Sequence, residues 1–356
     1  MTNAGALTPV SRDSPVLQVE GLSVAIRTPR GMLHAVRDVS FSVRRGETLC
    51  IVGESGCGKS MTSLAVMGLL PAAAERRARA LRLAGEDLLS STPRRINALR
   101  GDRMAMIFQE PMTALNPAYT IGEQLSEVYR HHRGASKSAA RDRAVELLEM
   151  VGIAAASERL AQYPHQLSGG LRQRVMIAMA LMCSPDLLIA DEPSTALDVT
   201  IQAQILRLLS GLQRELGIAM VLITHDLGVV ARIADRVCVM YAGEVVEEGR
   251  TAVVFGSPSH PYTQGLLSCI PVPGRATRGG VLGTIPGTVP SLIGTRGGCS
   301  FRDRCSHAVA PCSDSVGWQT DLDEHRWRCP VVRGSSGEPG GHVATFAVNQ
   351  LQGTKA

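Results

Sequence analysis

The eight residues Gly53–Ser60 (GESGCGKS) constrain the fold more than any other stretch of this chain. Two glycines flank four residues and a Lys-Ser pair follows, which is the pattern of a phosphate-binding loop. The apolar run Thr48–Val52 before the loop is typical of a buried strand, and Ser60–Leu70 after it is typical of a helix. A strand that leads through a glycine loop into a helix directs backbone N–H groups towards an anion. The sequence therefore predicts a nucleotide site, with a chance glycine turn as the alternative.

Each residue of this loop, and the one after it, is a candidate to contact the nucleotide. Lys59 is expected to reach the β- and γ-phosphates, and Ser60 to hold Mg²⁺. For Cys57 we expect the backbone N–H, not the sulfur, to matter. The full predicted set is Gly53, Glu54, Ser55, Gly56, Cys57, Gly58, Lys59, Ser60 and Met61.

Composition excludes several other classes of protein. Hydrophobic residues make up 44% and charged residues 19% of the 356 residues, which is ordinary for a soluble globular protein. Only 3% are aromatic, so we expect no nucleic-acid partner that binds by base stacking. No apolar run reaches the length of a membrane span, and the N-terminus lacks the pattern of a signal peptide. In the reducing cytoplasm, the nine cysteines favour metal ligands or core thiols over disulfides.

Strand-like and helix-like segments alternate along the chain, which predicts an α/β fold with a parallel sheet. Residues 1–15 read as a tail, 16–250 as the nucleotide-binding domain, and about 111–185 as a helical subdomain inserted into it. Proline and glycine become frequent after residue 250, so 251–332 read as a small extension and 333–356 as a disordered tail. The clearest individual elements are the strands 48–52, 186–190, 218–224 and 236–241 and the helix 199–216.

Two acidic residues, Asp191 and Glu192, directly follow the apolar strand 186–190. In a protein with a phosphate-binding loop, an acid at such a strand end lies opposite the Mg²⁺. Asp191 is therefore predicted to hold the metal. Glu192 is predicted to act as the general base that polarises the attacking water.

Further motifs resemble those of ABC ATPases, in the same order along the chain. Leu167–Arg174 (LSGGLRQR) is similar to the signature motif, Gln109 to the Q-loop glutamine, Ser194–Asp198 to the D-loop, and His225 to the switch histidine. The resemblance implies a P-loop ABC ATPase core with a RecA-like parallel sheet, an antiparallel β subdomain and an inserted helical subdomain. It implies that Gln109 and His225 join Glu192 in catalysis, and that Gln109 also binds Mg²⁺. It further implies that signature and D-loop residues bind ATP held by a second subunit: Ser168, Gly169, Gly170 and Asp198.

Other stretches are similar to the ATPase subunits of importers for dipeptides, oligopeptides and nickel. These stretches are Glu110–Pro117, Tyr163–Gln166, His260–Thr263 (HPYT), Ile285–Leu292 (IPGTVPSL) and Gly298–Cys305 (GCSFRDRC). The resemblance implies ATP hydrolysis that powers the import of small peptides, at the cytoplasmic face of the inner membrane. The implied partners are two membrane permease subunits, a second ATPase subunit in a heterodimer rather than a homodimer, and an extracytoplasmic peptide-binding protein.

Two alternative functions stay open at this point. An importer for nickel or another solute would have the same motifs, because this subunit does not contact the solute. A soluble ABC ATPase that acts on DNA or ribosomes is the other alternative. Such proteins typically have long coiled-coil inserts or two ATPase units in one chain, and neither feature is in this sequence.

One stretch departs from the family pattern. ABC ATPases usually offer an aromatic side chain near the first strand that stacks on adenine, but Val24–Arg27 has none. Arg27 can stack on the base through its planar guanidinium, or Ile26 can pack against it.

Four cysteines, Cys299, Cys305, Cys312 and Cys329, lie close together near the C-terminus. No pair has the CxxC spacing of a zinc ribbon, and four thiolates can hold either Zn²⁺ or a [4Fe–4S] cluster. Resemblance to the peptide importers implies the iron–sulfur cluster, with zinc or buried free thiols as alternatives. None of the nucleotide motifs lies in this segment, so we expect nucleotide binding to survive loss of the metal.

Overall fold

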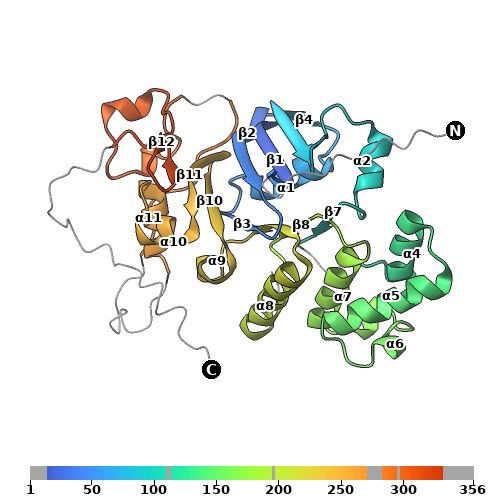
Figure 1. Ribbon diagram of the computed structural model, residues 1–356. Coiled ribbons are helices and arrows are strands. Elements are labelled where there is room, and N and C mark those ends of the chain that lie inside the picture. The colour runs from blue at the N-terminus through green and yellow to red at the C-terminus, as the bar shows by residue number, and fades with distance from the viewer. Residues whose placement is uncertain (1–13, 110–113, 195–196, 271–282, 295–296, 332–356) are drawn as a thin grey trace.

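The computed structural model describes residues 14–109, 114–194, 197–270, 283–294 and 297–331. The predicted N-terminal tail (apart from Ser14 and Pro15), the tail 333–356, Glu110–Thr113 of the loop after Gln109, and two D-loop residues, Thr195 and Ala196, lie outside these ranges. An eight-stranded sheet and a five-stranded sheet form the centre of the molecule, with helices at one end and the C-terminal segments at the other (Figure 1).

The large sheet has the strand order β12-β13-β11-β10-β3-β9-β8-β7. Five adjacent strands of this sheet, β10, β3, β9, β8 and β7, run parallel to one another. Every residue of β3, β8 and β9 is buried, as continuous apolar runs predict for strands covered on both faces. The parallel strands are β3 (Thr48–Val52), β7 (Met104–Ile107), β8 (Leu187–Asp191), β9 (Ala219–Ile223) and β10 (Arg236–Tyr241).

The two faces of this sheet belong to two hydrophobic cores, because neighbouring strand residues point to opposite sides. Cys50 and Val52 enter the core under the helices, whereas Leu49 and Ile51 enter the core under the smaller sheet. That smaller, antiparallel sheet has the order β2-β1-β5-β6, with β4 also paired to β1. Its strands are β1 (Leu17–Thr28), β2 (Gly31–Val43), β4 (Ala74–Arg77), β5 (Ala80–Leu83) and β6 (Glu86–Asp87). Helices α1 (Lys59–Met67) and α2 (Pro93–Leu99) contribute residues to the same core.

The helices between β7 and β8 form the group at the right of Figure 1. Local sequence signals set their ends. Thr120 and Glu123 form a capping box at the start of α4, and Gly134 ends that helix in a left-handed conformation. The group consists of α4 (Ile121–Arg133), α5 (Lys137–Met150), α6 (Ala156–Arg159), the 3-10 turn η1 (Pro164–Gln166) and α7 (Gly169–Leu181). Two further helices, α8 (Val199–Leu216) and α9 (Leu227–Ile233), follow β8 and β9.

The C-terminal segments join both sheets. Strand β13 (Arg326–Trp327) pairs with β11 (Glu244–Arg250) and with β12 (Gln319–Thr320), which widens the large sheet. At the smaller sheet, the N–H of His34 on β2 donates a 2.8 Å hydrogen bond to the carbonyl of Leu292. The remaining elements here are α10 (Thr251–Gly256), α11 (Pro261–Ser268), η2 (Arg302–Arg304) and η3 (Ala310–Ser313). The extension therefore continues the sheets of the nucleotide-binding domain.

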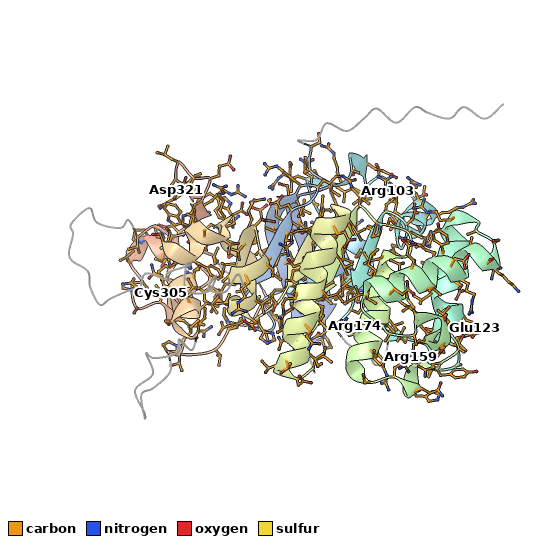
Figure 2. All side chains as sticks on the ribbon, turned by 60° about the horizontal axis from the view of Figure 1, so that its bottom comes forward. Arg103, Glu123, Arg159, Arg174, Cys305 and Asp321 are labelled. Atoms are coloured by element: carbon orange, nitrogen blue, oxygen red, sulfur yellow. The ribbon has the colours of Figure 1, made fainter. Side chains whose placement is uncertain are left out.

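Figure 2 shows Cys305 and Asp321 at one end of the molecule and Glu123 and Arg159 of the helical group at the other.

Among the helices described, none is both long and apolar enough to cross a membrane.

Candidate active site

The predicted catalytic residues follow neighbouring parallel strands. The glycine loop follows β3, His225 follows β9, Asp191 and Glu192 come at the end of β8, and Gln109 follows β7. These strands are adjacent in the order β3-β9-β8-β7. Because parallel strands end at the same edge of a sheet, the topology gathers these segments at one edge, where ligands of open α/β folds bind.

The two glycines on either side of the loop have no space for a side chain. A Cβ on Gly53 would lie 2.1 Å from the carbonyl oxygen of Met240, and one on Gly58 would lie 2.3 Å from that of Ala35. Both have φ values, 149° and 101°, that other residues rarely adopt. The loop therefore requires glycine at these positions. Ser55 and Gly56 lie exposed at its tip.

Lys59 is buried, with 5% of its surface exposed. Its Nζ donates hydrogen bonds to the carbonyl oxygens of Gly53 at 2.8 Å and Glu54 at 3.0 Å, so the loop curves around the ammonium group. Burial raises the pKa of the neighbouring Cys57 thiol, which keeps that sulfur protonated and unreactive.

Ser60 and Asp191 meet across the sheet edge. The Ser60 hydroxyl donates a 3.0 Å hydrogen bond to Asp191 Oδ1. Burial raises the pKa of Asp191, and the Ser60 hydrogen bond and the charge of Lys59 oppose that rise. A hydroxyl beside a buried carboxylate is a set of oxygen ligands that suits Mg²⁺, so the residues present fit the predicted metal.

Glu192 lies between the other two predicted catalytic residues. Its Oε2 accepts a 3.1 Å hydrogen bond from Gln109 Nε2, and its Oε1 lies 3.6 Å from Nδ1 of His225. The backbone of Glu192 has φ 43°, a conformation that costs free energy for a residue with a side chain. Strain of this kind is typical of functional positions, and here it places the carboxylate between Gln109 and His225.

The signature residues lie at the start of α7. The Ser168 hydroxyl caps this helix by accepting from the N–H of Leu171 at 3.4 Å. A Cβ on Gly169 would meet Leu197, and one on Gly170 would meet Ile201, so this turn packs against the D-loop and α8. Asp198 caps α8 and accepts from the N–H of Ile201 at 2.9 Å.

Met61 and Arg27, both predicted to contact the nucleotide, differ in burial, because Met61 packs against the core and Arg27 is exposed. Met61 on α1 packs against the core beneath the smaller sheet. Arg27 is exposed near the end of β1, and its backbone pairs with Met32 of β2. Ile26, the alternative at this position, packs partly against the same core as Met61.

The structure shows contacts of Glu54 that the sequence analysis missed. Its carboxylate accepts hydrogen bonds from both terminal nitrogens of Arg304, at 2.7 and 3.1 Å, and its N–H donates to the hydroxyl of Tyr262 at 2.9 Å. Glu54 is thus tied to the C-terminal extension, although we predicted it only as a nucleotide contact. Arg304 lies in GCSFRDRC and Tyr262 in HPYT. The only indication in the sequence that these residues matter was that both motifs resemble stretches of the peptide-importer ATPases.

The four C-terminal cysteines gather in one region. Burial, followed by the neighbouring thiols of Cys312, Cys329 and Cys305, raises the pKa of Cys299 to about 11. The N–H of Cys299 also donates a 2.8 Å hydrogen bond to the carbonyl of Cys312. Within the described ranges, no group of three or more Cys, His, Asp or Glu side chains has an arrangement that could hold a metal ion. The four thiols are nevertheless close enough for Cys312, Cys329 and Cys305 to raise the pKa of Cys299.

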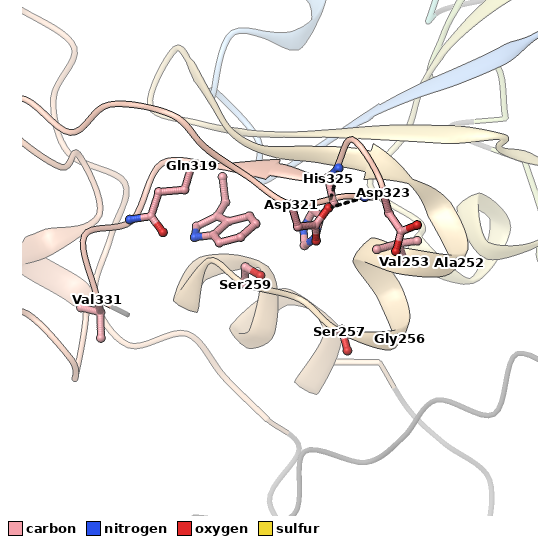
Figure 3. Close-up of a pocket in the computed structure, with 11 residues that line it drawn as sticks. Ala252, Val253, Gly256, Ser257, Ser259, Gln319, Asp321, Asp323, His325 and Val331 are labelled. Atoms are coloured by element: carbon pink, nitrogen blue, oxygen red, sulfur yellow. Dashed lines mark hydrogen bonds and ion pairs between the residues drawn. The ribbon is translucent and has the colours of Figure 1, made fainter. Parts of the chain in front are cut away.

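A separate pocket of about 630 Å³ lies beside the β12–β13 hairpin (Figure 3). Asp321 and His325 of the hairpin face Ala252, Val253 and Ser257 of the segment around α10. His325 is held by Asp321 at 3.2 Å and by the fully buried Glu247 at 2.7 Å. None of the predicted nucleotide or catalytic residues lines this pocket.

Two family models match the chain. Residues 36–195 match the model described as ABC transporter, and residues 246–312 match the model described as oligopeptide/dipeptide transporter, C-terminal region. Together these matches include the glycine loop, the signature motif and three of the four clustered cysteines.

Curated relatives match over nearly their whole length. A putative peptide import ATP-binding protein of Brucella abortus is 51% identical over 325 residues, which cover 87% of this chain and 95% of the relative. The dipeptide transport ATP-binding protein DppD of Bacillus subtilis is 50% identical, over 88% of this chain and 94% of its own. The oligopeptide transport ATP-binding protein OppD of Salmonella typhimurium is also 50% identical, over 84% and 89%.

Two of the solved structures that match cover about two thirds of this chain. The ATP-binding cassette MJ0796, solved as a dimer in a post-hydrolysis state bound to ADP and Pi, superposes with a TM-score of 0.59 at 28% identity. The match covers 98% of that cassette but 66% of this chain. Another match, cbiO1 of Clostridium perfringens, has a TM-score of 0.58 at 27% identity and covers 92% of that protein and 69% of this chain.

Proposed function

This chain belongs to the ATP-binding subunits of the oligopeptide and dipeptide ABC transporters, and we propose that it hydrolyses ATP to power the import of small peptides. The observation that carries this proposal is the combination of both domains in one set of relatives. DppD and OppD match the nucleotide-binding domain and the C-terminal extension together, at about 50% identity. Their printed names describe dipeptide and oligopeptide transport.

In the proposed reaction Glu192 accepts the proton of the water that attacks the γ-phosphate. Gln109 holds one carboxylate oxygen and His225 lies beside the other, so both orient the base. The ammonium of Lys59 and the N–H groups of the loop bind the phosphates. Ser60, Asp191 and Gln109 would hold Mg²⁺, which would supply positive charge to neutralise the phosphate oxygens.

We propose that two such subunits form the working unit. In this chain the signature turn Ser168–Gly170 packs against Leu197 and Ile201. We propose that the start of this helix, which Ser168 caps, binds a nucleotide held by the other subunit, because the N–H groups of a helix start attract an anion. The dimeric MJ0796 cassette supplies a precedent for two cassettes together. We favour a heterodimer with a related ATPase subunit, as the resemblance to peptide importers implies.

The proposed permease contact lies on the helical side of the molecule. Phe108 and Tyr119, on either side of the loop that follows Gln109, are 42% and 54% exposed. Exposed aromatic side chains beside a catalytic segment suit a docking surface. Two permease subunits, a peptide-binding protein outside the cell, and a peripheral location at the cytoplasmic face of the inner membrane complete the proposal.

For the four cysteines we propose a [4Fe–4S] cluster, with Zn²⁺ as the alternative. What supports the proposal is the type and number of the side chains, because four thiolates can bind either group and the four cysteines lie in one region, where Cys299 and Cys305 pack against the core. Cys299, Cys305, Cys312 and Cys329 would hold it. The cluster would cross-link segments that contain few hydrophobic residues of their own, and iron would also supply one-electron redox chemistry.

Uptake measurements test the proposed substrate class. Cells that lack this subunit are supplied with labelled dipeptides, labelled longer peptides or nickel, with the parent protein or Glu192→Gln restored. We expect peptide uptake to return with the parent protein only. Uptake of nickel, but not peptides, that depends on this subunit would contradict the proposal.

A further inference from the structure

Two motifs of the C-terminal extension contact Glu54 of the glycine loop, and a third holds one of those contacts in place. HPYT contributes Tyr262 and GCSFRDRC contributes Arg304, whereas IPGTVPSL contributes the carbonyls of Ile285 and Pro286, which bind Arg304. Tyr262 accepts from the N–H of Glu54, and Arg304 binds its carboxylate. These segments are more than 200 residues from Glu54 in sequence.

Arg304 is held in place on every side. Its Nε donates to the carbonyl of Pro286 at 2.7 Å and one terminal nitrogen donates to that of Ile285 at 3.1 Å. The guanidinium carbon lies 5.7 Å from the ring centre of Tyr241 and 5.9 Å from that of Phe301. Only 5% of the side chain is exposed. These contacts and this burial hold the positive charge of the guanidinium at one position beside Glu54.

Tyr262 fixes the backbone of the same residue. It is fully buried, and burial raises the pKa of its hydroxyl, so the group stays neutral and accepts the N–H of Glu54. Glu54 in turn supplies one of the two carbonyl oxygens that hold Lys59. The chain of contacts therefore runs from the extension through Glu54 to the lysine predicted to bind the phosphates.

Glu54 brings a negative charge into a loop that binds a polyanion. A carboxylate beside bound phosphates repels them unless a positive charge neutralises it, and the repulsion is strong in partly buried surroundings. The bidentate pair with Arg304 provides that neutralisation.

We propose that Arg304 is a positioning residue of the nucleotide site: it neutralises and holds Glu54, so that the C-terminal extension sets the affinity of the glycine loop for nucleotide. The inference rests on the proposed ATPase function. It also revises our expectation that the cysteine segment is independent of nucleotide binding, because Arg304 directly precedes Cys305.

The test compares MgATP affinity in four full-length proteins, measured by titration with a fluorescent ATP analogue. In Arg304→Met the unpaired Glu54 should weaken binding about tenfold. The deficit should shrink at high salt, because added ions screen the repulsion. In Glu54→Gln/Arg304→Met the repulsive charge is absent, so affinity should recover towards that of the parent. The matched control is Arg302→Met, on the same 3-10 turn, whose guanidinium binds Gly297 and Asp303.

The outcomes separate the two proposals. Parent protein that binds no MgATP would overturn the proposed function and this inference with it. Normal binding by the parent and by Arg304→Met would overturn the inference alone. Weak binding in the double variant equal to that of Arg304→Met, at low and high salt, would also overturn it, because that result shows a structural defect and no charge effect.

Discussion

Gln109 Nε2 donates a 3.1 Å hydrogen bond to Glu192 Oε2, and this bond links the ends of the adjacent strands β7 and β8 across 83 residues of sequence. The carboxylate therefore has a fixed orientation before any water is polarised. A change in the position of Gln109 would change this hydrogen bond to the proposed base. The bond therefore connects the side that we propose faces the permease with the carboxylate of Glu192.

Replacement of Glu192 by Gln should nearly abolish ATP hydrolysis and leave ATP binding in place. The amide keeps the shape of the side chain but cannot accept a proton, and loss of a general base costs about two to four powers of ten in rate. Single-turnover hydrolysis and nucleotide titration measure the two effects separately. Hydrolysis by the variant at close to the parent rate would show that another group is the base.

Replacement of Lys59 by Ala should weaken nucleotide binding itself. The change removes a buried ammonium that holds the carbonyls of Gly53 and Glu54 and that is placed to bind phosphates. Titration with a fluorescent ATP analogue measures the loss. Replacement of exposed Lys137 at the start of α5 serves as the control for loss of one positive charge. Equal affinities in the two variants would contradict the assignment of the loop.

Protein purified without oxygen should be brown and should contain about four irons per chain. Replacement of Cys305 by Ser should bleach the colour, whereas replacement of Cys269, which binds the carbonyl of Gly265 in α11, should not. Visible absorbance and metal analysis measure both results. Colourless protein with one zinc would exclude the iron–sulfur cluster, and protein without metal would exclude both proposed groups.

The stability contributed by His325 should decrease as pH rises. Burial lowers the pKa of His325, but the hydrogen bonds and charges of Glu247 and Asp321 together outweigh burial and raise it overall. A raised folded-state pKa means that the protonated form stabilises the fold fully below the unfolded value of about 6.5 and ceases to do so above the folded-state pKa. The difference in melting temperature between the parent and His325→Gln should therefore be largest near pH 6 and smaller at pH 9. A difference that grows with pH would contradict this.

Sequence reasoning located the elements whose signal is local. The predicted strands Thr48–Val52 and Arg236–Tyr241 and the helix Val199–Leu216 coincide with β3, β10 and α8, because long apolar or periodic runs and an Asp cap define them. The sequence analysis did not predict strand β11, because two adjacent glutamates, Glu247 and Glu248, are typical of an exposed segment and not of a buried strand. Their burial depends on partners that lie far away in sequence, such as His325 and Arg326.

The same distinction applies to the site. Each of the proposed site residues belongs to a local motif. Ser60 belongs to the glycine loop, Asp191 and Glu192 follow an apolar strand, and Gln109 and His225 belong to motifs that resemble those of ABC ATPases. The contact of Arg304 with Glu54 joins positions 250 residues apart, and no local pattern in either segment indicates the other. Pairings of this kind follow from the way the extension folds back onto the domain, which requires the three-dimensional structure.

The pairing of β13 with β11 also determines what a shortened chain would do. A chain cut after Arg250 would lose the strand that covers β11 and would leave an open row of backbone N–H and C=O groups. It would also lose the Ser259 and His260 N–H groups and the His325 ring that satisfy the buried carboxylate of Glu247. An uncovered strand edge pairs readily with other chains. We therefore expect the extension to protect the domain against aggregation, and the domain alone to be recovered as insoluble material although it contains every ATPase motif.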